Sequence, residues 1–232
     1  MCSSDLEHKK IAIAVDGPAG AGKSSISKVV ANTLGYLYID TGAMYRAVTW
    51  AVLDQDLNPD DQAQVESILP SLELTMEPSD ASCKVFIKGR DVTGLIRQQA
   101  INDNVSKIAS YKAVREYLVE RQQAMAKVGG VILDGRDIGS VVLPDAELKI
   151  YLTASVEARA KRRWLEVKGT DNEQPLVEIQ ESVQNRDEMD KNRKESPLVC
   201  VEDAIVVDSS NLTFEETVAH ILTLVQETIE HE

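Results

Sequence analysis

One segment near the start of the chain has the residue types and spacing needed to hold phosphate groups. Gly17-Pro-Ala-Gly-Ala-Gly-Lys-Ser24 satisfies the pattern G-x-x-x-x-G-K-[ST]. Glycines let the backbone curl around phosphate oxygens with its N–H groups inward, where a Cβ would obstruct the approach. Lys23 could then reach the β and γ phosphates of a nucleotide, and the Ser24 hydroxyl could bind Mg²⁺. The predicted ATP-binding residues are Gly17, Pro18, Ala19, Gly20, Ala21, Gly22, Lys23, Ser24 and Ser25.

A second segment, Val131-Ile-Leu-Asp-Gly-Arg-Asp137, combines a short apolar run with two acids and an arginine. An apolar strand that ends in Asp134 has the form of a strand whose carboxylate holds Mg²⁺, directly or through water. Arg136 and Asp137 follow at the carboxyl end of that strand, where open α/β sheets bind their ligands. We therefore predict a metal site at Ser24 and Asp134. An ordinary polar turn is the alternative.

Two further segments carry groups that suit a phosphorylated acceptor. Asp40-Thr-Gly-Ala-Met-Tyr-Arg46 supplies a hydroxyl, an aromatic ring and a guanidinium that could fork onto a phosphate. Arg186, Asp190 and Arg193 have the spacing i, i+4, i+7, which predicts one helix face able to bridge phosphate and ribose hydroxyls. The alternatives are a surface salt bridge for Arg46 and an internally paired, solvated helix for residues 186–193.

The elements that must position these residues follow from the apolar pattern. Nearly continuous apolar runs predict strands of a largely parallel sheet covered on both faces: Ile11–Val15, Leu37–Ile39, Val131–Leu133, Leu148–Leu152 and Ala204–Val207. Helical patterns lie between them, so the fold class is α/β. The helix after the glycine loop carries its apolar residues at positions 26, 29, 30 and 34.

The last helix begins at a capping box formed by Thr213 and Glu216, with apolar residues at positions 214, 218, 221, 222, 225 and 229. A different pattern occupies the middle of the chain. Residues 72–76 alternate with period two and residues 84–88 do so more loosely, as half-buried antiparallel strands would. We expect a small antiparallel insert between the second and third core strands.

Composition limits the function classes. The chain has 232 residues with 43% apolar content, enough for one substantial core, and no apolar run long enough to cross a bilayer or to resemble a signal peptide. Its three cysteines, Cys2, Cys83 and Cys200, lack C-x-x-C spacing, which argues against a disulfide framework or zinc site and fits a reducing compartment. We expect a cytoplasmic protein, with no membrane partner, and residues 1–10 as a polar tail.

The net charge of −13 disfavours a nucleic acid as the main partner, whereas a small phosphorylated substrate needs only a few local cations. Arg159, Arg162 and Arg163 are concentrated in this way, although a solvated helix face would produce the same charge run. No K-x-D triplet occurs, so the usual guanine-reading motif of GTPases is missing. A small-molecule kinase becomes the leading class.

With these motifs in order, the chain from Ile11 to its C-terminus resembles the bacterial cytidylate (CMP) kinases. The resemblance rests on G-P-A-G-A-G-K-S, D-T-G-A-M-Y-R, D-G-R-D-I-G and R-D-x-x-D-x-x-R. It implies a P-loop kinase fold with a five-stranded parallel sheet, an NMP-binding insert and a mobile helical lid. The expected domains are a core at residues 11–66 and 127–232, a lid at about 155–195, and an insert at 67–126.

The resemblance also assigns site residues. It implies that the cytosine contacts are Ser106, Arg115 and Asp137, and that the arginines on the acceptor phosphate are Arg46, Arg136 and Arg193. It places Arg186 and Asp190 on the ribose, with Thr41 and Tyr45 lining the pocket, and Arg159, Arg162 and Arg163 on the transferring phosphoryl group. Within this set the expected catalytic residues are Lys23, Arg136, Arg159 and Arg163. The resemblance implies ATP and CMP or dCMP as substrates and Mg²⁺ as the cofactor. It also implies that the protein is a monomer.

We expect unequal roles for the three lid arginines. We expect Arg159 and either Arg162 or Arg163 to point into the cleft. The alternatives to a CMP kinase are a kinase for another small acceptor, such as UMP, dTMP or shikimate, and an ATP-binding module without turnover. Such a module would have no use for Asp137, Arg186 or Asp190.

Overall fold

The computed structural model describes residues 10–79, 82–127, 129–170 and 173–231, so the expected tail lies, except for Lys10, outside the described residues. Its core is a five-stranded sheet with the order β2-β6-β1-β7-β8, all parallel, as the apolar runs predict. The strands are β1 (Ala12–Asp16), β2 (Leu37–Asp40), β6 (Val131–Gly135), β7 (Leu148–Thr153) and β8 (Ile205–Asp208).

The predicted strands are confirmed, with ends that differ by one or two residues. Several strands extend further at the carboxyl end than the apolar runs do, and so include Asp16, Asp40 and Asp134. The register pairs Asp16 with Gly135 and Asp40 with Asp134 across neighbouring strands. Polar side chains that the hydrophobic pattern leaves out are therefore held by the sheet itself, side by side at its ligand-binding edge.

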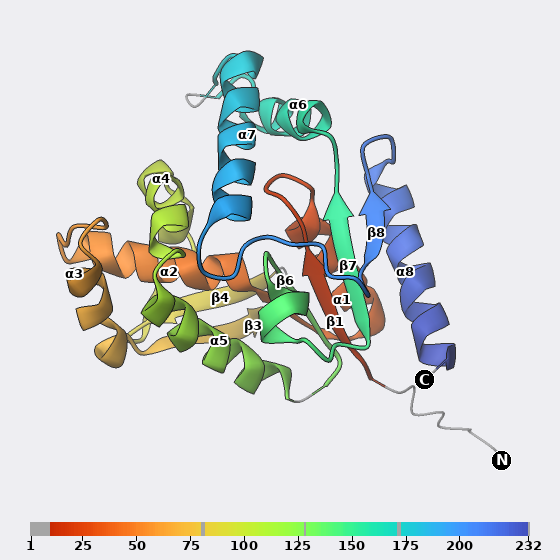
Figure 1. Ribbon diagram of the computed structural model, residues 1–232, viewed down its shortest axis with the longest axis horizontal. Helices are drawn as coiled ribbons and strands as arrows, with labels where there is room; N and C mark the ends of the chain where they lie inside the picture. The colour runs from red at the N-terminus through yellow and green to blue at the C-terminus, as the bar shows by residue number, and fades with distance from the viewer. Residues whose placement is uncertain (1–9, 80–81, 128, 171–172, 232) are drawn as a thin grey trace.

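Helices cover both faces of the sheet and its carboxyl edge (Figure 1). They are α1 (Lys23–Leu34), α2 (Thr41–Asp54), α3 (Gln62–Ser67), α4 (Gln99–Ile108), α5 (Lys112–Ala126), α6 (Val156–Val167), α7 (Leu176–Asn192) and α8 (Phe214–His231). Successive β1 side chains face opposite sides: Ile13 packs with the core formed by α1 and α8, and Ala14 with the core that contains α2 and α5.

One strand departs from the expectation of two covered faces. In β8 only Val207 is buried, whereas Ile205 is 41% and Val206 57% exposed. β8 is one of the two edge strands and pairs only with β7, so its apolar residues reflect strand propensity rather than burial. Val29 in α1 and Phe214 at the start of α8 are also exposed, although the helical patterns placed both on apolar faces.

The helix ends follow local chemistry. The capping box at α8 is confirmed, because Glu216 N–H donates to Thr213 Oγ1 at 3.1 Å and Thr213 N–H donates to the Glu216 carboxylate at 2.8 Å. α1 ends at Gly35, which adopts the left-handed conformation with φ 66°.

The insert is a three-stranded antiparallel sheet formed by β3 (Leu74–Ser79), β4 (Ser82–Ile87) and β5 (Arg90–Asp91). The first strand begins two residues later than the alternation suggested, after a 3-10 turn at Leu69–Ser71 and the positive φ of 46° at Glu73. Val85 and Ile87 share one hydrophobic core with α2, so the insert rests on the main domain (Figure 1). Its limits at residues 67 and 126 stay a prediction.

α6 and α7 pack against each other beyond the carboxyl ends of the strands, where the lid was expected (Figure 1). Ser155 caps α6 by accepting the Ala158 N–H at 3.1 Å. Among the described residues, no helix is long and apolar enough to span a membrane.

Candidate active site

The glycine loop joins β1 to α1 and leaves no room for side chains on its strand side. Gly17 has φ 148°, and a Cβ at this position would lie 2.0 Å from the Leu152 carbonyl oxygen. Lys23 is buried at the start of α1, and its Nζ donates to the carbonyl oxygens of Gly17 and Pro18, at 2.8 Å each. Burial, together with the positive charge of Arg136, lowers the pKa of Lys23. The loop thus surrounds an ammonium group, as a phosphate-binding loop requires.

The two predicted metal ligands touch each other. Ser24 Oγ donates to Asp134 Oδ2 at 2.8 Å, although the residues come from different elements. The other carboxylate oxygen, Oδ1, accepts the hydroxyl of Tyr38 at 2.7 Å. Burial, and secondarily the charge of Asp40, raises the pKa of Asp134 to about 6. A hydroxyl and a carboxylate are hard oxygen ligands of the kind that Mg²⁺ prefers, so the pair fits that ion.

A separate pocket, which includes residues from the carboxyl end of β6, is lined by the predicted acceptor residues. It contains every residue assigned to CMP except Arg46, together with three that sequence reasoning did not name. Its lining is Thr41, Tyr45, Val105, Ser106, Ala109, Arg115, Gly135, Arg136, Asp137, Arg186, Asp190 and Arg193.

Asp137 lies at the centre of a buried charge cluster in this pocket. Its Oδ2 pairs with Arg115, and its Oδ1 lies 3.8 Å from Nη2 of Arg193. Arg115 is fixed in turn, because its Nη1 donates to the Ala109 carbonyl at 3.1 Å and its guanidinium lies 5.4 Å from the centroid of the Tyr45 ring. The carboxylate therefore has a defined position and stays paired, as a buried charge must.

A second ion pair joins the end of β6 to α7. Arg136 Nε donates to Asp190 at 2.7 Å, and Arg136 Nη1 donates to the Gly135 carbonyl at 3.2 Å. Gly135 is required here, since a Cβ would lie 2.7 Å from Thr41 Oγ1 and 2.6 Å from Ile138 Cδ1. The close approach lets Thr41 donate to the Asp134 carbonyl at 2.7 Å. The start of α2 is thereby tied to the strand that carries Asp134.

Arg193 reaches the pocket by a route that the sequence did not indicate. α7 ends at Asn192, and Arg193 has the extended backbone angles φ −63° and ψ 142°. Its Nε donates to the Ser196 carbonyl at 2.5 Å. The prediction that residues 186, 190 and 193 share one helix face is therefore wrong for Arg193, because the helix stops one residue too early.

Several buried polar atoms around this pocket have no hydrogen-bond partner in the described part of the chain. They are Tyr45 Oη, Arg46 Nε, Arg115 Nε, Arg186 Nε and Arg193 Nη2. Most are guanidinium donors, so an anionic ligand with several oxygens would satisfy them. Arg46 itself pairs with Asp40 at 3.1 Å. Burial and the charge of Arg136 lower the pKa of Arg186 to about 10, which leaves it cationic at neutral pH.

The three lid arginines point in different directions. Arg159 is buried; its Nη1 donates to the Ala19 carbonyl at 2.9 Å, and both Nη atoms bind the Asp187 carboxylate. Arg162 turns away from the cleft and donates to the Ser209 carbonyl at 2.5 Å. Arg163 is half exposed and pairs with Glu166 at 2.9 Å. Only Arg159 contacts the phosphate loop in this structure, so the cleft-facing role of Arg163 stays a prediction.

Sequence reasoning missed two buried residues at the strand edge. Tyr38 gave no signal, because a tyrosine in an apolar run normally packs in a core. Asp16 gave a weak one, as a charged residue at the end of an apolar run and directly before the glycine loop. Its carboxylate accepts the backbone N–H groups of Ile138 at 2.8 Å and Gly139 at 2.7 Å.

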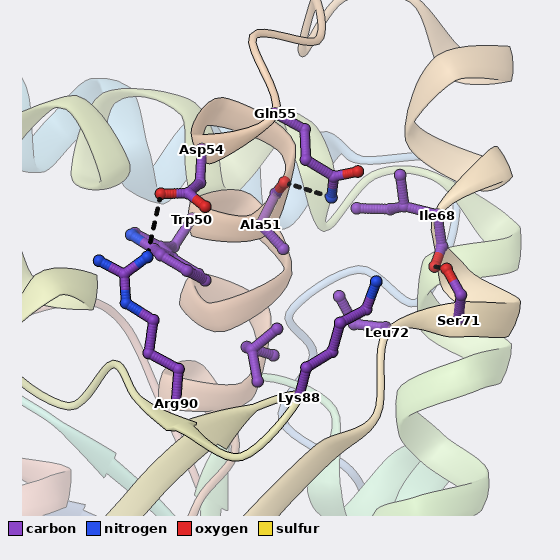
Figure 2. Close-up of a pocket in the computed structure, with 10 residues that line it drawn as sticks. Trp50, Ala51, Asp54, Gln55, Ile68, Ser71, Leu72, Lys88 and Arg90 are labelled. Atoms are coloured by element: carbon purple, nitrogen blue, oxygen red, sulfur yellow. Dashed lines mark hydrogen bonds and ion pairs between the residues drawn. The ribbon is translucent and has the colours of Figure 1, made fainter.

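A separate cavity of about 320 Å³ lies under the insert, between the end of α2, residues 68–72 and the turn that joins β4 to β5 (Figure 2). Arg90 lies 5.0 Å over the Trp50 ring and 3.6 Å from Asp54, which closes one wall. Lys88 rises from the same turn as Arg90 and extends between it and Leu72 (Figure 2). None of the predicted site residues lines this cavity, so its residues serve as controls remote from the acceptor pocket.

Comparisons with known proteins agree with the geometry. Residues 13–227 match the sequence model of cytidylate kinases. A cytidylate kinase of Ligilactobacillus salivarius is 47% identical over 221 residues, covering 94% of this chain and 98% of the relative. One from Caldicellulosiruptor bescii is 47% identical over 224 residues, covering 97% and 99%.

Among solved structures, a gluconokinase from Sinorhizobium meliloti is similar with a TM-score of 0.50 at 16% identity, covering 97% of this chain and 96% of that one. A shikimate kinase from Bacteroides thetaiotaomicron has a TM-score of 0.48 at 11% identity, covering 93% and 98%. The first likeness supports the P-loop kinase fold alone. The full-length sequence matches, together with the phosphate loop and the arginine-lined pocket, place this chain in the cytidylate kinase family.

Proposed function

We propose that this protein transfers the γ-phosphoryl group of ATP to CMP and dCMP, giving ADP and the corresponding diphosphate. Family membership supports the reaction class. The observation that carries the acceptor assignment is the buried Asp137, held between Arg115 and Arg193 in a pocket lined by further arginines. An ionised carboxylate accepts a hydrogen bond from the exocyclic amine of cytosine, but would oppose the carbonyl oxygen of uracil.

On the donor side, the backbone of residues 17–25 surrounds the ATP phosphates and Lys23 moves from its loop carbonyls onto the β and γ phosphates. Ser24 and Asp134 would hold Mg²⁺. That ion, when bound, supplies positive charge to the phosphate oxygens. No cluster of three His, Cys, Asp or Glu side chains suited to a metal occurs among the described residues, so phosphate and water oxygens would supply the other ligands.

On the acceptor side, each group of the nucleotide has chemically matched partners. We assign the CMP phosphate to Arg46, Arg136 and Arg193, and the ribose to Arg186 and Asp190, beside Thr41 and Tyr45. The base is assigned to Ser106, Arg115 and Asp137. The unpartnered guanidinium nitrogens of Arg46, Arg186 and Arg193 support this division, because phosphate and ribose oxygens would pair them.

The chemistry needs positioning more than proton transfer. The acceptor is already an ionised phosphate, so no general base is required, and the cations bring its oxygen into line with the γ-phosphoryl group. Arg159 lies at the phosphate loop, whereas Arg163 would have to swing inward as the lid closes. Closure would also exclude water, which otherwise competes as the acceptor.

Residence in the cytoplasm as a monomer, with no nucleic acid or membrane partner, belongs to the same proposal. It is supported by the net charge of −13, by cysteines without disulfide spacing and by the small-molecule character of both substrates.

A coupled ADP-release assay with CMP, dCMP, UMP, dTMP and shikimate tests the proposal. We expect turnover with CMP and dCMP to exceed that with the other acceptors by roughly 10²-fold. Lys23→Ala should abolish release, with at least a ~10³-fold loss, because it removes the cation on the transferring group. Lys88→Ala, in the remote cavity, should retain full activity. A preference for another acceptor, or ATP binding without turnover, would contradict the assignment.

A further inference from the structure

Asp16 ends the central strand β1 and is buried, with 6% of its surface exposed. It lies directly before the phosphate loop, and its register partners are Gly135 on β6 and Tyr151 on β7. Its two carboxylate oxygens accept the backbone N–H groups of Ile138 at 2.8 Å and of Gly139 at 2.7 Å. These two amides begin a short π-helical turn, Ile138–Val142, that follows Asp137.

A residue in the place of Asp137 would ordinarily cap this turn itself. Aspartate before a helical turn accepts the first free N–H groups with its own side chain. Asp137 makes no such bond, since its carboxylate is paired with Arg115 and Arg193 on the pocket side. Asp16 bonds the turn's first two N–H groups in its place. The Asp137 carboxylate therefore does not have to cap the turn and can point into the pocket, where it pairs with Arg115 and Arg193.

The backbone of Asp137 belongs to the same turn. Its carbonyl accepts the N–H groups of Val141 at 2.9 Å and of Val142 at 3.2 Å. If the first amides of the turn lost their bonds to Asp16, the backbone of Asp137 would be held less firmly. The direction of its carboxylate would then change. Arg136, one residue earlier, makes the bond to Asp190.

Gly139 lies between Asp16 and Lys149, with little room for a side chain. A Cβ on Gly139 would lie 3.4 Å from Asp16 Oδ2 and 3.2 Å from Lys149 Cδ. Lys149 cannot withdraw easily, because it is buried and its Nζ donates to Asp203 at 2.6 Å. A methyl group at position 139 would therefore crowd the Lys149 stem and lie in van der Waals contact with the Asp16 carboxylate, which provides a second way to disturb the turn.

We propose that Asp16 is a positioning residue for the acceptor nucleotide: it caps the 138–142 turn from the neighbouring strand and so holds Asp137 in the direction that reads the base. The inference rests on the proposed function. It assigns to the residue before the phosphate loop a role on the acceptor side rather than on the ATP side. Asparagine cannot replace it, because its amide NH₂ would face one of the two N–H donors.

The test compares Asp16→Asn with wild type in steady-state kinetics and in amide hydrogen exchange. We expect kcat/KM for CMP to fall roughly 10- to 100-fold, the scale of one lost hydrogen bond to a charged acceptor. The preference for CMP over UMP should narrow, while KM for ATP stays within about twofold. The amides of Ile138 and Gly139 should exchange faster in the variant, and those of α8 should be unaltered.

Two further variants make the result decisive. Gly139→Ala keeps the carboxylate but crowds the turn against Lys149, and should reproduce the loss for CMP with an unchanged KM for ATP, even if Asp16→Asn fails to fold. Asp61→Asn removes the charge from the cap of α3, where Asp61 accepts the Gln64 N–H at 3.2 Å, and should leave both KM values unchanged.

A raised KM for ATP with normal use of CMP would overturn the proposal, and so would unchanged exchange at Ile138 and Gly139 in Asp16→Asn. The exchange measurement needs no turnover, so it reports on the contact even if wild type does not phosphorylate CMP. A wild type that does not phosphorylate CMP would refute the proposed function. The exchange measurement would still decide whether Asp16 holds the turn.

Discussion

Tyr38 donates its hydroxyl to Oδ1 of Asp134 at 2.7 Å, from the strand next to the one that carries the acid. Because Ser24 occupies the other oxygen, Asp134 is bound on both sides and its carboxylate has one orientation. A carboxylate that is to hold a metal ion works best when its own partners fix it. The tyrosine therefore supports the proposed metal site without being a ligand itself.

Tyr38→Phe should raise the Mg²⁺ concentration needed for half-maximal activity by roughly 3- to 10-fold, since the carboxylate loses one of its two partners. Phenylalanine fills the same buried space, so the free energy of unfolding should fall by no more than about 1–3 kcal/mol. Mg²⁺ titrations of ADP release, with urea unfolding beside them, measure both. Tyr36→Phe, which removes the hydroxyl that accepts the Ile11 N–H at 3.2 Å, is the matched control and should not change the Mg²⁺ requirement.

Base choice should depend on the charge of Asp137. Wild type is expected to prefer CMP over UMP by roughly 10²-fold or more, because uracil would leave buried polar groups unpaired. Asp137→Asn supplies both a donor and an acceptor, so the ratio should narrow while activity with CMP falls. The values of kcat/KM for both nucleotides decide the matter. An unchanged ratio would move base recognition onto Ser106 and Arg115.

The lid arginines should differ in their kinetic effects. Arg159→Ala removes a contact to the phosphate loop and leaves the Asp187 carboxylate unpaired, so kcat should fall by roughly 10²-fold or more, and more than KM for CMP rises. Arg163→Ala should also lower kcat if lid closure brings that residue inward. Arg162→Ala should have the smallest effect on kcat, because Arg162 bonds the loop after β8. Equal, small effects of all three would favour a solvated helix face.

Burial raises the pKa of Asp16 to about 6 from its ordinary value of 3.8. The folded protein thus binds this proton more tightly than the unfolded chain, and the carboxyl favours folding most below pH 4. That contribution is lost as the pH rises through about 6, and a difference of about 2 in pKa corresponds to at most about 3 kcal/mol.

Urea unfolding of wild type and Asp16→Asn at pH 4 and pH 7 measures this contribution. The stability of wild type relative to the variant should decline with rising pH, because asparagine does not titrate. A difference that is constant with pH, or that grows, would show that the two backbone N–H bonds outweigh the cost of burying the charge.

The sequence by itself determined the features that a local pattern encodes. The strands coincide with apolar runs because each buried strand of a parallel sheet needs apolar side chains on both faces; β8, at one edge, is largely exposed. The phosphate loop was predictable for a similar reason. Its glycines occupy positions where a side chain would clash. A Cβ at Gly17, for example, would lie 2.0 Å from the Leu152 carbonyl oxygen.

The acceptor residues were predicted as a group only through the resemblance, since spacing alone left a solvated helix open for Arg186 and Asp190. The structure then gathered them, with the exception of Arg46, around one pocket. Arg193 is in the pocket for a different reason than the predicted helix face. It lies beyond the end of α7 and approaches Asp137 from the segment that follows the helix.

Tertiary structure alone decided the contacts that span the chain. Asp16 meets Ile138 across 122 positions, and Tyr38 meets Asp134 across 96. No local signal names the partner of either residue, because the partner is set by the order of strands in the sheet rather than by the neighbours in sequence. Parallel strands bring their carboxyl ends to one edge, and this geometry turns isolated polar residues at strand ends into a site.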